Sequence, residues 1–172
     1  MPLKNKFIFT WKIMRMSSFS LKNFLGVSLV LFSCSSVLAQ TAKDVALDMK
    51  IEGIEFVHPF TEEDDLNNQL GRPNQYVEKV SWPDKRIDPK FESDGFYDEE
   101  IAPSEFKGGT IEKFRNTADL NRRYEYINNI YLKSPFLNQY MYKKGLFLMR
   151  LDKEFKPTQA KQYEREFNRV VK

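Results

Sequence analysis

Short runs of alternating apolar and polar residues predict five β-strands. The runs are IEFVHP at 54–59, QYVEKVSW at 75–82, GTIEKF at 109–114, and the two arms of a hairpin at 140–142 and 146–151. The arms of the hairpin flank the sequence KKG, and Gly145 supplies the positive φ that such a turn often requires. Pro59 and Pro83 end the first two strands because proline has no N–H to donate.

Apolar residues spaced three and four apart predict helices between these strands. The first runs from about Lys43 toward Gly53, and an acidic segment at 61–71 is expected to form one or two helical turns. The clearest helix begins at the N-cap Asn116 and places Leu120, Tyr124, Ile127 and Tyr131 on one face. The last follows Pro157 and places on one face Ala160, Tyr163, Phe167 and Val170.

The order α-β-β-β-α-β-β-α predicts the fold class. We expect residues 43–172 to form a single α+β domain. A mainly antiparallel sheet of four or five strands with helices packed on one face is the simplest arrangement that buries these apolar faces.

The first forty residues have the pattern of an export signal. Residues 1–39 carry five basic residues and no acidic one, and the apolar stretch 24–32 is too short to span a membrane. Small or slender side chains at Val37 and Ala39 predict cleavage after Ala39. Met14 or Met16 is an alternative start to Met1. The basic head, the short apolar stretch and the cleavage site together predict an exported protein, periplasmic or extracellular.

The only cysteine, Cys34, leaves a second processing route open. The sequence LFSC at 31–34 resembles the lipobox of bacterial lipoproteins, in which residues 1–33 would be removed and Cys34 lipidated, so the protein would be membrane-anchored. Phe32 is bulkier than that motif prefers. With either cut, no cysteine remains in the domain for a disulfide, a zinc site or a thiol nucleophile.

Charge excludes one class of partner once the leader is removed. The remaining chain has 22 Lys and Arg against 24 Asp and Glu, a net charge of about −2. Nucleic-acid binding needs a concentrated basic surface, so we expect no nucleic-acid partner. The same balance predicts membrane contact only through the signal or a lipid anchor.

Residues 83–106 are expected to form a long loop, because they contain three prolines and many charges. Such long loops are often functional. We therefore take Phe91, Phe96 and Tyr97 as a candidate binding surface, with the solvated loop as the simpler alternative. Arg72, in the turn GRPN, is kept as a further candidate contact or buried ion-pair partner.

Four motifs in order resemble a family of small exported bacterial proteins and lipoproteins. They are LGRPNQY, GGTIEKF, LFLMRLD and KPTQAKQYE, and they span Leu70 to Glu164. Lys156 stands where the pattern prefers threonine. The resemblance implies an exported envelope protein and no established activity.

Candidate catalytic groups do not converge in the sequence. His58 is the only histidine, so it lacks the partners of a metal site, and no serine lies in a G-x-S-x-G context. The acidic clusters at 62–65 and 98–100 lack calcium-loop spacing and suit a solvated surface. Arg122 and Arg123 are expected on the polar flank of their helix, paired with Asp119 and Glu125. We expect no cofactor and no metal.

These observations predict a non-catalytic exported domain that binds a protein, a peptide or a component of the cell envelope. Two alternatives remain open at this point. One is an inhibitor or immunity-type protein that inserts loop 83–106 into a partner enzyme. The other is a hydrolase that uses two carboxylates in a cleft.

Overall fold

One antiparallel sheet organises the chain. The computed structural model describes residues 39–88 and 101–172, which belong to one compact unit. Its strands have the order β1-β2-β3-β5-β4. The elements are α1 (Ala42–Asp48), β1 (His58–Pro59), β2 (Glu78–Pro83), the 3-10 turn η2 (Pro103–Glu105), β3 (Gly108–Lys113), α2 (Thr117–Lys133), the 3-10 turn η3 (Pro135–Leu137), β4 (Tyr140–Lys144), β5 (Phe147–Leu151) and α3 (Pro157–Val170).

The predicted α+β class is confirmed, with five antiparallel strands and helices packed against the sheet. The hairpin of β4 and β5 turns at Gly145, which has a φ of 56°. Helix α2 begins at the predicted cap, where the Asn116 side chain accepts the N–H of Asp119.

Two predicted elements are shorter than expected. Only His58 and Pro59 pair with β2, while Ile54 forms an isolated bridge with Asp84. Residues 61–71 form turns instead of a helix. Carboxylates explain this second difference, because Asp64 accepts the N–H of Thr61 and Asp65 accepts those of Gln69 and Leu70.

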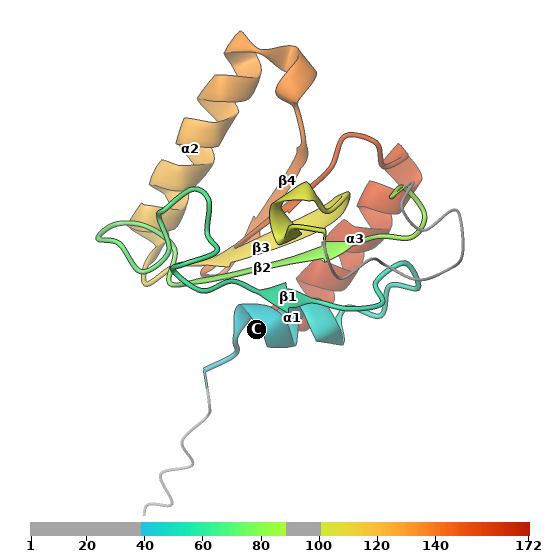
Figure 1. Ribbon diagram of the computed structural model, residues 1–172, viewed down its shortest axis with the longest axis horizontal. Helices are drawn as coiled ribbons and strands as arrows, with labels where there is room; N and C mark the ends of the chain where they lie inside the picture. The colour runs from blue at the N-terminus through green and yellow to red at the C-terminus, as the bar shows by residue number, and fades with distance from the viewer. Residues whose placement is uncertain (1–38, 89–100) are drawn as a thin grey trace, which may run out of the picture. The chain divides into compact units, whose positions relative to one another are not determined.

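Helices α1 and α3 cover the first face of the sheet with an apolar core (Figure 1). Trp82 of β2 and Tyr163 of α3 stack at its centre, 5.9 Å apart, and the indole Nε1 donates to the tyrosine hydroxyl at 3.0 Å. Gly109 is required here, since an added Cβ would lie 2.2 Å from the Trp82 ring. The site described below therefore rests on a tightly packed layer.

Helix α2 packs against a second core on the opposite face. This core contains Leu120 and Ile127 of α2, together with Leu148 of β5. The neighbours of Leu148, Phe147 and Met149, belong to the first core, because side chains alternate across a strand. Helices therefore cover parts of both faces, where the pattern alone led us to expect one.

The two ends of the compact unit are joined by hydrogen bonds. The Gln40 side chain donates to the carbonyl of Val170 at 2.9 Å and accepts the backbone N–H of Lys172 at 3.3 Å. In Figure 1 the C-terminus accordingly lies beside α1.

Candidate functional site

The second face of the sheet carries a polar row beside the core of α2. Alternation in the central strands turns Lys79, Ser81, Thr110, Glu112 and Arg150 to this face. Lys79 pairs across the strands with Glu112, and Thr110 lies opposite both Ser81 and Arg150. Polar side chains in the middle of a sheet are unusual, so this face calls for a structural or functional reason.

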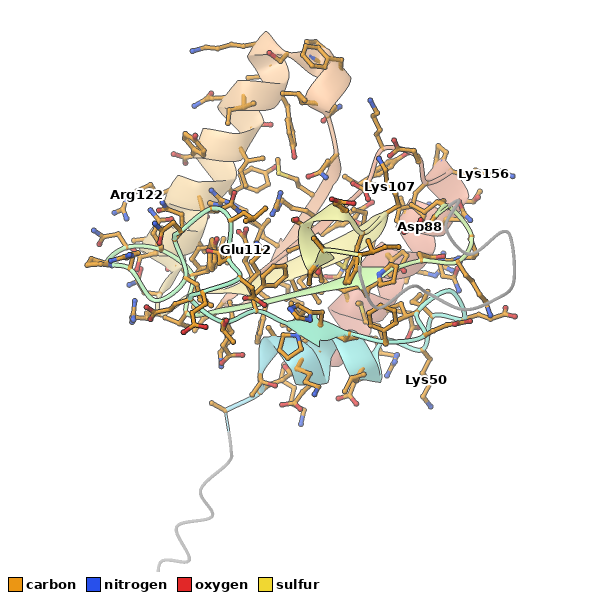
Figure 2. All side chains as sticks on the ribbon, in the orientation of Figure 1. Lys50, Asp88, Lys107, Glu112, Arg122 and Lys156 are labelled. Carbon is orange, nitrogen blue, oxygen red and sulfur yellow. The ribbon has the colours of Figure 1, made fainter. Side chains whose placement is uncertain are left out.

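Glu112 is the centre of this row and is fully buried. Arg123 of α2 donates to both of its oxygens, at 3.2 and 3.1 Å, and Arg150 donates to one at 3.0 Å. Burial alone would raise the pKa of the Glu112 carboxyl, but the two guanidinium groups lower it. Glu112 therefore stays ionised and ties α2 to β3 and β5. Its side chain is labelled in Figure 2.

A second buried carboxylate, Asp65, fixes the loop in front of β2. Lys79 donates to one oxygen at 2.7 Å, and the Tyr76 hydroxyl donates to the other at 2.7 Å. Burial would raise the pKa of Asp65, but these bonds and the N–H groups of Gln69 and Leu70 lower it to about 2. The expectation of a solvated acidic cluster was therefore wrong for Asp65.

A cavity of about 280 Å³, which we call the sheet-face hollow, opens over this polar row. Apolar side chains of Phe60, Leu66 and Phe106 form part of its wall, and Lys79, Arg150 and Asp152 are its charged residues. The complete lining is Phe60, Leu66, Asn67, Lys79, Ser81, Pro103, Ser104, Phe106, Gly108, Gly109, Thr110, Gln139, Arg150 and Asp152. Eight of these fourteen residues are polar or charged, so the hollow suits a polar or charged group better than an apolar one.

Arg150 links the hollow to the buried network. Its Nη1 donates to the Gln139 side chain at 3.2 Å, and Gln139 in turn donates to Asp152 at 3.0 Å. Within the part of the chain that the structure describes, the buried Nε of Arg150 has no hydrogen-bond acceptor. An unsatisfied buried N–H is costly, so the position of the Arg150 side chain has a structural cost at the wall of the hollow.

Asp152 is the remaining carboxylate of the hollow. Its two oxygens accept the N–H of Gly108 at 2.7 Å and the amide of Gln139. Burial raises the pKa of Asp152 in spite of these bonds. Both oxygens thus hold the wall of the hollow together.

The predicted contact residues lie in different places. Arg72 is exposed and donates to the Asn68 side chain at 3.1 Å, so it is not a buried ion-pair partner. Its loop forms one wall of a second cavity of about 360 Å³, whose lining includes Gln69, Gln75 and, from α2, Tyr126. Cys34, Phe91, Phe96, Tyr97 and the acidic cluster at 98–100 lie outside the described residues. The described end of loop 83–106, at Pro103, Ser104 and Phe106, borders the sheet-face hollow.

His58 has a structural partner, and it does not activate Ser81, the serine opposite it. Its Nε2 lies 2.8 Å from an Asp64 oxygen, and its ring packs edge-on against Phe60. Ser81 is opposite His58 in the sheet, but its hydroxyl donates to the carbonyl of Pro103 at 3.3 Å. Within residues 39–88 and 101–172, no three His, Cys, Asp or Glu side chains are grouped so that they could hold a metal ion.

The sequence prediction missed the buried charges. Arg122 does pair with Asp119 at 2.9 Å, but Arg123 turns inward to Glu112. The signal was a charged residue at an inward position of an apolar strand, seen in Glu112 of GTIEKF and Arg150 of FLMRL.

The chain matches none of the protein-family models, curated proteins or solved structures with which it was compared. Among the described residues, no helix combines the length and apolar content needed to cross a membrane.

Proposed function

We propose that the protein is an exported, non-catalytic binding domain. Its ligand is a protein, a peptide or an envelope component that places an acceptor-rich group, such as a carboxylate, in the sheet-face hollow. The observation that carries this proposal is the lining of the hollow, in which Lys79 and Arg150 supply positive charge among mainly polar side chains.

The state of the carboxylates supports binding over catalysis. Both oxygens of Glu112 and of Asp65 accept hydrogen bonds from the protein, and their pKa values are lowered. Groups held in this way cannot exchange protons near neutral pH, as general acids and bases must. Asp152 has a raised pKa, but its two oxygens are held by the N–H of Gly108 and the amide of Gln139.

Export is part of the same proposal and rests on the first forty residues. A signal peptide ending at Ala39 would release the domain into the periplasm or the medium, and lipidation at Cys34 would anchor it to a membrane. The four motifs that resemble exported bacterial proteins and lipoproteins support either route.

Site-specific photocrosslinking tests this function. A photoreactive residue replaces Leu66, which is exposed at the hollow, or Leu47, which is exposed on α1 away from it. We expect the Leu66 position to crosslink a defined component of the native envelope fraction and the Leu47 position to leave it uncrosslinked. Equal crosslinking at both positions would contradict the assignment.

Affinity for the purified component then identifies the contacts. Ser104→Trp fills the hollow from an exposed position, and Arg150→Lys keeps a charge but removes Nε. Both should weaken binding at least tenfold, whereas Thr158→Trp on the exposed surface of α3 should leave it unchanged. Circular dichroism verifies that each variant is folded. Unchanged affinity in both hollow variants would rule out the hollow as the site.

A further inference from the structure

The end of α2 exposes an unusual group of large apolar side chains. Leu132 is 72%, Phe136 70% and Leu137 47% exposed. The described residues expose seven large hydrophobic side chains, and these three fall within six positions of the chain. We call Leu132, Pro135, Phe136 and Leu137 the apolar tip. Clustered exposed apolar residues mark interaction sites.

The apolar tip is held in a fixed conformation. Turn η3 is closed by hydrogen bonds from Leu137 to Ser134 and from Asn138 to Pro135, at 2.9 and 3.1 Å. Lys153 donates to the carbonyl of Phe136 at 2.8 Å. The turn lies at the end of α2 that is farthest from the sheet (Figure 1). The apolar side chains are therefore presented on a convex, braced surface.

The charge around the apolar tip is basic. Between Glu125 and Asp152 the chain contains no acidic residue. Three of the four basic residues in this stretch lie away from the tip, because Lys143 contacts Asn121 near the start of α2, Lys144 contacts Asn168 near the end of α3, and Arg150 binds Glu112. The fourth is Lys133. Lys133 and Lys153 are exposed beside the tip.

The two acidic residues next in sequence make contacts with other parts of the fold. Asp152 is engaged by Gly108 and Gln139, and Glu154 pairs with Lys107 at 3.4 Å. The net charge of about −2 for the whole domain therefore does not describe this surface.

We propose that the apolar tip docks on an anionic lipid surface. Phe136, Leu132 and Leu137 would enter the boundary between head groups and acyl chains, as interfacial apolar residues do. Lys133 and Lys153 would keep their ammonium groups at the level of the lipid phosphates. A convex apolar tip fits a deformable planar surface, and the flanking lysines supply the complementary charge. This contact is independent of the sheet-face hollow and of any lipid at Cys34.

A local fluorescent reporter tests the proposal in the full chain, because it reads the tip and not the N-terminus. Phe136→Trp is compared with Leu47→Trp, so both proteins share the background of Trp11 and Trp82. The probes are vesicles of phosphatidylcholine, with or without phosphatidylglycerol. We expect the emission of Phe136→Trp to shift to the blue and to be quenched by brominated acyl chains only on vesicles with phosphatidylglycerol. Leu47→Trp should not respond.

Charge reversal tests the role of the lysines. Adding Lys133→Glu and Lys153→Glu to Phe136→Trp should weaken vesicle binding at least twentyfold, since each lysine near an anionic surface contributes roughly fivefold and reversal exceeds removal. The matched control, Lys161→Glu and Arg165→Glu on exposed positions of α3, should change it little. Equal responses on both kinds of vesicle, no response on either, or a blue shift that grows with protein concentration in the absence of lipid would each overturn the proposal.

Discussion

Replacing Asp65 by asparagine removes the charge that anchors the loop before β2. The aspartate accepts four hydrogen bonds, from Lys79, Tyr76 and the N–H groups of Gln69 and Leu70. An asparagine can place its oxygen toward three of these donors. Its amide nitrogen then faces the Lys79 ammonium group, which becomes an almost fully buried charge without its carboxylate.

The size of the expected loss in stability follows from the pKa of Asp65. Asp65 has a pKa of about 2 in the folded protein against an ordinary value of 3.8. The lowered folded pKa contributes about 2 kcal/mol to stability above the unfolded pKa, and this contribution disappears as the pH falls through the folded pKa. Removing one member of a buried pair costs ~3–5 kcal/mol in other proteins. We therefore expect Asp65→Asn to lower the free energy of unfolding by about 2–5 kcal/mol at neutral pH.

Urea unfolding monitored by circular dichroism measures this loss at neutral pH and at about pH 3, where the linked contribution of Asp65 falls to about 1 kcal/mol. The penalty of Asp65→Asn should accordingly shrink by about 1 kcal/mol in acid. Glu63→Gln, an exposed neighbour, should change stability by less than about 0.5 kcal/mol. The double variant Asp65→Asn/Lys79→Met should be more stable than Asp65→Asn because no buried cation remains. A penalty below about 1 kcal/mol that does not vary with pH would refute the reasoning.

Two further substitutions test the sheet itself. Glu112→Gln leaves the guanidinium groups of Arg123 and Arg150 without their shared carboxylate, so urea unfolding should show a loss of about 3–5 kcal/mol, whereas Glu125→Gln on the exposed side of α2 should be nearly neutral. Gly109→Ala forces a methyl group into the Trp82 ring and should cost about 1–3 kcal/mol by the same measurement; an unchanged midpoint would mean that the ring moves without penalty.

Local signals account for the parts of the fold that the sequence predicted well. Asn116 accepts an N–H in the first turn of α2, and Gly145 adopts the positive φ of the hairpin. Both act through residues at most three positions away, so they can be recognised without the tertiary structure. The apolar stripe of α3 is local in the same sense, and all four of its predicted positions are buried.

The candidate site depends on long-range pairing and was therefore not predictable in this way. Glu112 and Arg150 are 38 positions apart, and Asp65 and Lys79 are 14 apart. A carboxylate is buried only where such partners lie close to it in the fold. The local sequence does not show these partners, so Asp65 could not be distinguished from the exposed acidic residues beside it. The sequence was equally ambiguous for Arg123. It does not show whether the polar flank of α2 faces solvent or packs beside the sheet.

The hydrogen bonds of Gln40 to Val170 and Lys172 have a consequence for how this unit can be joined to other sequences. They bring the points of entry and exit of the fold together. A unit whose ends adjoin can be inserted into a surface loop of a host protein, or circularly permuted, with little distortion. A short linker from residue 172 to residue 40 should therefore permit new termini at the exposed hairpin turn near Gly145.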